Sequence, residues 1–477
     1  MDKKKLGACV FAWILGCVGC AVGPKYHRPD VPAAPVYKEL AGSDQWKTAS
    51  PDEGLIRGSW WELFEDPQLN TLVTTVDVSN QTVKQAEAQF RAAQALVAYS
   101  RANYYPTIGV QPGITSSHPS SNLGARAFGG GTFTQYNVPF SASWEPNFWG
   151  TISLTVQNAA ANAQSSAADL ENMRLSMRAE LAVDYFQLLG SDMQIQLLTE
   201  TIAAYEKALQ LTVNRRTSGI ASSLDVAQAE AQLEGTRAQV TDVKVTRSQL
   251  EHAIAVLLGQ TPSSFSLPPG QIKNAPPQIP VGLPSQLMER RPDIAVSERL
   301  VAAANAEIGL AKIAYYPLVN LTAAGGLESS SISSLFNWPS RFWSLGASAA
   351  QTLFDFGRRR ALTQQAEANY DAVVAAYRQT VLNAFQEVED QLSTLQQLAQ
   401  EQAQQEAAVK ASDEALRLET DRYKAGTASY LDVITSQTIV LTNRRSVVAL
   451  LQRRMTAAVT LIRAIGGGWT SANLPKP

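Results

Sequence analysis

The chain has 477 residues, of which 17% are charged, and its formal net charge is -2. This balance gives no basic surface for nucleic acid and no strongly acidic tail, so nucleic-acid binding is excluded as its main function. The length allows two or three ordinary domains. Long stretches of Ala, Gln and Ser with sparse Leu and Val favour closely packed helices and an elongated shape.

The first twenty residues are typical of a secretory leader. Residues 3–5 are lysines and residues 8–18 form an apolar run, so we predict a signal peptide over residues 1–19. All three cysteines lie in this leader, which leaves the mature chain without a disulfide framework or a zinc site. The arrangement is typical of a lipoprotein, and we favour Cys20 as the lipidated residue, with Cys17 as the alternative and an unmodified leader as a third reading. No Asp follows either cysteine, which permits localisation to the outer membrane.

An internal duplication spans most of the chain. Tyr104-Tyr105-Pro106 recurs 211 positions later as Tyr315-Tyr316-Pro317. Further along, matching residues are 207 positions apart: Gly150 and Gly357, Gly219 and Gly426, Leu224-Asp225-Val226 and Leu431-Asp432-Val433, and Gly259 and Gly466. The constant offset predicts helices of equal length in both halves. The change of offset places a length difference of four residues in the segment between, where loops absorb it.

The duplication divides the chain into units. We predict an N-terminal segment over 20–83, repeat 1 over 84–260, a linker over 261–292, repeat 2 over 293–466 and a tail over 467–477. Each repeat would contain a helix, then a strand pair (106–147 and 317–356), then a long helical hairpin. The linker carries eight prolines, so we expect it to cross the surface without regular helix or central strand. Residues 21–35 are also expected to be extended.

Apolar and small polar residues alternate in four segments, two in each repeat, which predicts four strands of roughly ten residues. The clearest runs are from Tyr136 to Trp144 and from Trp343 to Ala349. Their length and terminal aromatic residues suit outer-membrane strands, with two soluble hairpins as the alternative. Four strands are too few to enclose an aqueous lumen, and an open edge cannot face lipid. Other copies must therefore complete a barrel; closure alone permits a dimer as well as a trimer.

Residues 150–216 and 357–422 contain almost no helix breaker, so each predicts a helix about 100 Å long. Since a bilayer core is about 30 Å thick, these helices must stand clear of the membrane. The return helices carry apolar residues at coiled-coil spacing. Arg247 and Arg454 interrupt this seam. Either they make polar contacts between protomers, or their stems pack while their head groups reach solvent; we favour the second.

Together these features resemble the outer-membrane factor family of TolC-like exit ducts, most closely its OprM/NodT-type lipoprotein branch. The resemblance covers nearly the whole mature chain. The motifs that carry it are Cys20-Ala-Val-Gly-Pro-Lys-Tyr26, Trp60-Trp-Glu-Leu-Phe-Glu-Asp-Pro67, Arg290-Arg-Pro-Asp-Ile294, Ala302-Ala-Ala-Asn305 and Leu353-Phe-Asp-Phe-Gly357.

The resemblance implies an α+β membrane protein: a homotrimer with a twelve-stranded β-barrel, four strands per protomer, continuous with a long α-helical barrel and an equatorial mixed domain. It also implies passive export of drugs or other small molecules. An inner-membrane pump of the resistance-nodulation-division type would drive export through a periplasmic adaptor. The adaptor would dock on the hairpin tips, for which the candidate residues are Gly219, Ser222, Gly426 and Ser429.

In such ducts the tip closes like an iris. The positions here that match the family's constriction are Arg422, Tyr423 and Thr435. Thr435 departs from the aspartate of the family pattern, and Asp432 is a neighbouring candidate. Because the two tips differ, with Ser223 in one and Tyr430 in the other, we place the gate in the second repeat.

Two rival functions fit the sequence less well. The three histidines lie far apart, and neither a phosphate loop nor a nucleophile elbow occurs, so we expect no enzyme, catalytic residue, metal or cofactor. A lipid-anchored periplasmic coiled-coil scaffold without a pore would explain the helices but not the alternating strands.

Overall fold

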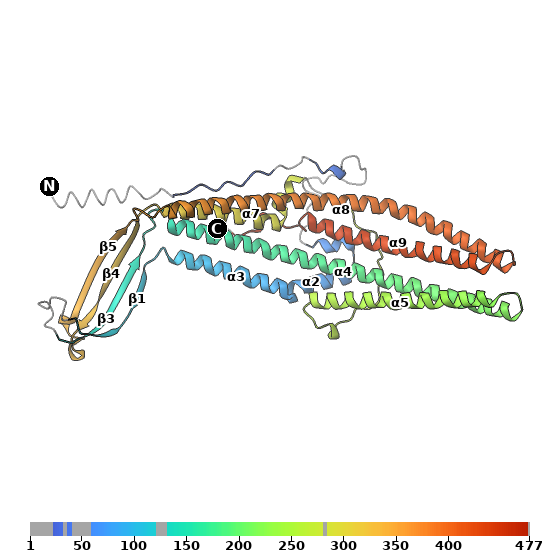
Figure 1. Cartoon of the computed structure of the whole chain (residues 1–477), viewed down its shortest axis with the longest axis horizontal. Coiled ribbons are helices and arrows are strands. Elements are labelled where there is room, and N and C mark those ends of the chain that lie inside the picture. The colour runs from blue at the N-terminus through green and yellow to red at the C-terminus, as the bar shows by residue number, and fades with distance from the viewer. Residues whose placement is uncertain (1–21, 32–35, 41–58, 121–130, 280–283, 476–477) are drawn as a thin grey trace.

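The computed structural model describes residues 22–31, 36–40, 59–120, 131–279 and 284–475. The molecule is elongated, with the strands at one end and two helical hairpins reaching the other (Figure 1). The predicted signal peptide and both candidate lipidation residues, Cys17 and Cys20, lie outside the described residues.

Two long helices of 67 residues each run through most of the molecule, α4 (Thr151–Thr217) and α8 (Arg358–Lys424). Each turns back into a helix of 35 residues, α5 (Ser223–Leu257) or α9 (Tyr430–Ala464). The equal lengths confirm the prediction made from the constant offset of 207. In the described part of the chain, no helix is both long and apolar enough to cross a membrane.

Shorter helices continue the return helices toward the strands. They are α3 (Gln81–Ala102) and α7 (Pro292–Ile313), and α3 is preceded by α2 (Pro67–Ser79), which we did not predict. α3 packs on α4, and α7 packs between α4 and α8 (Figure 1). Because α5 ends beside the start of α3, and α9 beside the start of α7, these pairs form two broken columns next to the two long helices.

The same type of polar contact joins both broken columns. At the first joint, Asn80 Nδ2 donates to the carbonyl of Leu257 at 2.8 Å. At the second joint, Arg291 Nη1 donates to the carbonyl of Ala464 at 2.9 Å. Arg291 lies 211 positions after Asn80, and Ala464 lies 207 positions after Leu257. Since the last carbonyls of a helix have no partner within it, each joint supplies one from the next helix.

A glycine lets the chain pass close to each joint. Gly259 has a φ of 67°, and a Cβ there would lie 2.5 Å from the carbonyl oxygen of Ser79. Gly466 has a φ of 95°, and a Cβ there would overlap the carbonyl oxygen of Arg290. Both the left-handed backbone and the close approach therefore require glycine.

The strands form one antiparallel sheet in the order β1, β3, β4, β5. The strands are β1 (Thr107–Val110), β2 (Gly113–Ser117), β3 (Phe133–Trp144), β4 (Leu318–Ser329) and β5 (Arg341–Ala350). The prediction of four strands is corrected, because the first is broken into β1 and β2, which both pair with β3. The break falls at Pro112, which has no N–H to donate to the ladder.

The register separates apolar from polar side chains, as the alternating pattern predicted. Phe140 aligns with Gly325 and Trp343 on one face. Ser141 aligns with Ala324 and Ser344 on the other. One face is therefore mainly apolar, and the other is lined mostly by small and polar residues. Within the described residues, the outer sides of β1, β2 and β5 are unpaired sheet edges.

The largest hydrophobic core lies in the middle of the molecule, where the linker and η2 (Trp60–Phe64) pack against the long helices. We predicted that the linker crosses the surface, but this is only partly correct, because Leu267, Ile272 and Ile279 enter this core. It also ends in a one-turn helix, α6 (Leu287–Arg290). The apolar residues between the prolines explain both differences, since burying them stabilises the linker against the helices.

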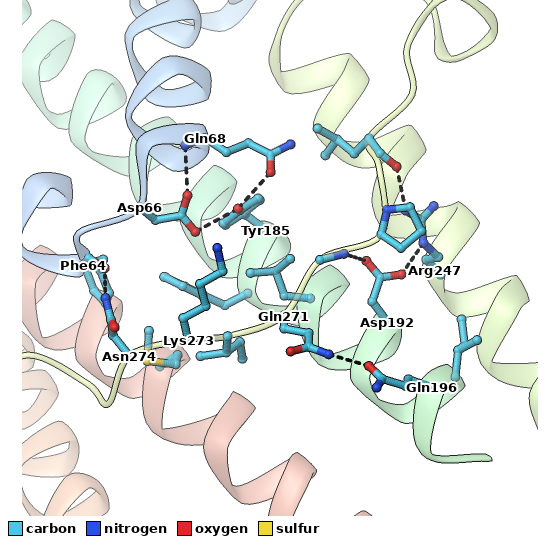
Figure 2. A pocket seen from close by; sticks show the side chains of 18 of the residues that line it. Phe64, Asp66, Gln68, Tyr185, Asp192, Gln196, Arg247, Gln271, Lys273 and Asn274 are labelled. Carbon is cyan, nitrogen blue, oxygen red and sulfur yellow. Dashed lines mark hydrogen bonds and ion pairs between the residues drawn. The ribbon is translucent and has the colours of Figure 1, made fainter. Parts of the chain in front are cut away.

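Arg247 fixes the linker to α4 and α5 (Figure 2). Its Nε donates to Asp192 at 2.5 Å and its Nη2 to the carbonyl of Leu267 at 2.7 Å. The second oxygen of Asp192 accepts the N–H of Gly270 at 2.9 Å. The expectation that this head group reaches solvent is therefore wrong. The Asp192 side chain is only 4% exposed, and a buried carboxylate requires a partner.

We expect Gly466→Ala to lower the melting temperature more than Gly426→Ala. Both residues have positive φ, 95° and 80°, so both variants carry the left-handed penalty of about 1–2 kcal/mol. Only the first would also collide with the backbone, since nothing lies within 4 Å of a Cβ at position 426. Thermal unfolding of detergent-extracted protein, followed by circular dichroism, measures the difference. An equal loss of melting temperature in the two variants would contradict the close backbone approach at position 466.

We also expect Arg247→Leu to destabilise the protein by about 3–5 kcal/mol, because it leaves the Asp192 carboxylate buried and unpaired. Adding Asp192→Asn should recover much of the loss, since the neutral amide is less costly to bury. The same unfolding assay compares the single and double variants, with Asp192→Asn alone as the control. If the double variant is as unstable as the sum of both single variants, the ion pair is not the cause.

Candidate functional site

The hairpin tips lie at the end of the molecule farthest from the strands (Figure 1). Ser222 caps α5: its hydroxyl accepts from the N–H of Asp225 at 3.1 Å, and its own N–H donates to the Asp225 carboxylate at 2.8 Å. Ser429 and Asp432 repeat this capping box at α9, with distances of 3.4 and 2.9 Å. Such reciprocal contacts fix where each return helix begins.

The loops before these caps are open to solvent. Gly219 and Gly426 have φ of 76° and 80°, and a Cβ on either would meet no atom within 4 Å. The four predicted docking residues therefore lie in the two exposed loops, on similar backbone. A partner can approach both loops without meeting a large side chain at either glycine.

Two gate candidates are engaged within their own helix. The Ser429 hydroxyl donates to Asp432 at 2.8 Å, and these hydrogen bonds hold the pKa of Asp432 below its usual value. Thr435 Oγ1 donates to the carbonyl of Leu431 at 2.9 Å. Both side chains are exposed, and among the described residues neither makes a hydrogen bond or ion pair to the first hairpin.

Tyr423 lies in a different environment, buried between the two hairpins with 7% of its surface exposed. Its ring packs 5.3 Å from that of Tyr430, within a small core completed by Ala229 and Val433. Burial raises the pKa of Tyr430. The difference between Tyr430 and Ser223 thus has a packing reason, since the tyrosine fills the space between the hairpins.

Arg215 was not predicted as a site residue, yet it bridges the hairpins. Its Nη1 donates to the carbonyl of Lys424 at 3.2 Å, and its guanidinium lies 4.6 Å from the centre of the Tyr423 ring. Such stacking is attractive and also orients the cation. The internal duplication could have identified Arg215 as a candidate, because it lies 207 positions before the gate candidate Arg422.

Arg422 itself points away from this contact. It is 57% exposed and pairs with Glu419 of its own helix at 2.8 Å. Three buried atoms at the tip, Tyr423 Oη, Arg215 Nε and Glu419 Oε2, have no hydrogen-bond partner within the described chain. Each unsatisfied atom costs roughly 1–3 kcal/mol. The contact between the hairpins is therefore weaker than its buried area suggests.

A pocket of about 1050 Å³ lies beside the linker, between α2, α4 and α5 (Figure 2). The hydroxyl of Tyr185 donates to Asp66 at 2.9 Å on one side, and the Arg247 and Asp192 pair closes the other side. Among the described residues, no group of three or more His, Cys, Asp or Glu side chains could hold a metal ion. The pocket's polar groups serve mainly to hold the linker.

The N-terminal segment is held along the outside of α7 and α8 (Figure 1). Arg28 Nε donates to the hydroxyl of Tyr377 at 3.2 Å, and Asn305 Nδ2 donates to the carbonyl of Pro24 at 3.0 Å. The N–H of Val22 reaches the carbonyl of Trp149 at 3.5 Å. Residue 22 therefore lies where α4 begins, next to the end of the sheet.

Comparisons with known proteins agree with this architecture. The family model described as "Outer membrane efflux protein" matches residues 72–260 and 283–467. The probable efflux pump outer membrane protein TtgC of Pseudomonas putida is 29% identical over 471 residues, covering 98% of this chain and 96% of that protein. Outer membrane protein OprJ of Pseudomonas aeruginosa is 30% identical over 472 residues, with coverage of 98% and 97%.

A solved structure of the outer-membrane channel OprN superimposes with a TM-score of 0.88 at 28% identity, over 94% of this chain and all of that chain. The two segments of the family match are separated by residues 261–282, so each covers one repeat. Fold, duplication and sequence therefore agree over nearly the whole chain. The chain belongs to the outer membrane efflux protein family, and it is an outer-membrane exit channel of a tripartite efflux system.

Proposed function

We propose that the channel is a homotrimer, in which three sheets complete a twelve-stranded barrel and six hairpins complete a helical tube. The observation that carries this proposal is the sheet itself. Among the described strands it has an apolar face, a small-polar face and two unpaired edges, and it continues into helices of 67 residues. An unpaired edge in lipid is costly, because its N–H and C=O groups have no water. Pairing β5 with the β1 side of a second copy removes both edges.

In this assembly the protein acts as a passive duct and catalyses no reaction. The polar face of the sheet lines the lumen, where small side chains leave room for drugs or other small molecules. An inner-membrane pump of the resistance-nodulation-division type supplies the energy. A periplasmic adaptor docks on the loops at Gly219, Ser222, Gly426 and Ser429. Their open surface supports this role.

We also propose a lipid anchor on Cys20, with Cys17 as the alternative. Val22 is held next to the end of the sheet. A lipid on Cys20, two residues earlier, would reach the membrane without unfolding the segment, because two extended residues span about 7 Å.

The gate is proposed at the tip, where Tyr423 sets the position of the second hairpin and the exposed Arg422, Asp432 and Thr435 face the neighbouring copies. Contact between Tyr423 and Arg215 of the same chain supports this division of roles. The scaffold alternative is disfavoured, since a soluble scaffold has no need for a sheet with one apolar face.

The duct predicts that detergent-extracted protein is a trimer that conducts ions in planar bilayers. Size-exclusion chromatography with light scattering gives the copy number, and single-channel recording gives the conductance. The same protein with residues 1–20 replaced by a cleavable, non-lipidated leader should still form trimers, since the sheet alone spans the membrane. A water-soluble monomer from this variant would support the scaffold and exclude the duct.

Substituting Arg422→Ala together with Tyr423→Ala should raise the conductance and the susceptibility of cells to antibiotics that the closed tip excludes. The physical reason is that the pair loses both the stacking on Arg215 and the exposed cation at the constriction. Arg417→Ala is the matched control, because Arg417 is an equally exposed arginine of α8 paired within its own helix. Equal conductance of the double variant and the control would place the gate elsewhere.

A further inference from the structure

Charged residues are almost absent from the sheet. In the described strands only Glu328 and Arg341 are charged. Glu328 is opposite Asn137, on the small-polar face. Arg341 is opposite Leu327, on the apolar face. The apolar face of the described strands thus carries a single ionised side chain, and it is a cation.

Arg341 terminates a graded row of side chains on β5. From the helical end of the strand outward, the row on the apolar face is Ala349, Ala347, Leu345, Trp343 and Arg341. Leu345 and Trp343 are 75% and 78% exposed. Along this row the side chains change from small to large apolar, then to aromatic and cationic, and aromatic and cationic side chains are typical of a membrane strand where it reaches the lipid headgroups.

The guanidinium of Arg341 is stacked on an exposed ring. Its central carbon lies 3.5 Å from the centre of the Trp338 ring, and Trp338 is 74% exposed. No carboxylate of the described residues pairs with Arg341. The N–H donors of a guanidinium lie in its plane, so a ring stacked on its face does not block them, and this planar fork can bind two oxygens of one phosphate.

We propose that Arg341 and Trp338 bind the phosphate of a lipid headgroup in the outer leaflet, while Trp343 packs against the same lipid below the headgroup. The end of the sheet that carries them is opposite to the end that joins the helices (Figure 1). In an outer-membrane channel whose helices lie in the periplasm, that end faces the outside of the cell. The proposal needs the membrane location of the sheet but not the trimer or the gate.

The positive charge of Arg341 favours the negatively charged phosphate of a lipid as its ligand. The rest of the apolar face is neutral, so a neutral hydrocarbon would cover it equally well without Arg341. An isolated cation at the edge of hydrocarbon is stabilised when an anion lies at the same depth, and the phosphates of lipid headgroups lie there. A carboxylate from a second copy is the competing partner, and the experiment separates the two.

Native mass spectrometry of the full detergent-extracted protein tests the proposal, with phosphatidylglycerol as the probe and diacylglycerol of the same chains as the phosphate-free control. We expect wild type to retain phosphatidylglycerol in preference to diacylglycerol. Arg341→Gln should weaken the binding of phosphatidylglycerol by about fivefold. Trp338→Leu should weaken it less, and Arg341→Lys should keep part of it.

Glu328→Gln is the matched control, since it removes the other strand charge from the opposite face and should leave lipid binding unchanged. Unchanged phosphatidylglycerol binding in Arg341→Gln would overturn the proposal. An equal loss in Glu328→Gln would do the same. A second copy would be the partner of Arg341, and the proposal wrong, if three results occurred together. Arg341→Gln would dissociate the oligomer, Arg341→Lys would bind lipid as well as wild type does, and Trp338→Leu would have no effect. Trp338→Leu keeps the charge, so it also reports on the site if Arg341→Gln does not assemble.

Discussion

The last carbonyl groups of a helix need partners, and this constraint shapes the whole molecule. α5 and α9 end in the middle of the helical region, where solvent cannot satisfy every terminal carbonyl. The next helix in each column supplies the donor, through Asn80 in one repeat and Arg291 in the other. Because each joint is hydrogen-bonded, a broken column can lie beside an unbroken helix along its whole length. Equal hairpins and a continuous wall both depend on this arrangement.

The two joints share backbone geometry but differ in chemistry. Asn80 is neutral and also accepts two N–H groups at the start of α3. Arg291 is charged and only 8% exposed, and Asp293 and Glu387 hold it at 2.6 and 2.8 Å. A buried cation is tolerated only with such partners. The second joint therefore connects α7, α8 and α9, whereas the first connects α5 to the end of α2 and the start of α3.

The sequence predicted the features that depend on neighbouring residues better than the features that depend on residues far apart in the chain. The constant offset between the repeats predicted helices of equal length, because each residue adds the same rise to a helix and equal numbers of residues therefore give equal lengths. Alternation predicted both faces of the sheet, because successive side chains of a strand point to opposite sides. The break at Pro112 needed the pairing partner, and the burial of Leu267 needed the core that receives it. Arg215 was missed because its role arises from Tyr423, more than two hundred residues away, although its position relative to Arg422 marked it.

Buried charged groups at the joints and buried polar atoms at the tip differ in whether the chain itself supplies their partners. At the joints and the linker the buried charges of Arg291, Arg247 and Asp192 all have partners. At the tip, buried atoms of Arg215, Glu419 and Tyr423 have no hydrogen-bond partner in the part of the chain that the structure describes. Water or a neighbouring molecule can supply the partners that these tip atoms lack. Separating the hairpins would expose these atoms to water, which returns part of the free energy lost with the stacked contact. This gain lowers the free-energy cost of separating the two hairpins of one chain.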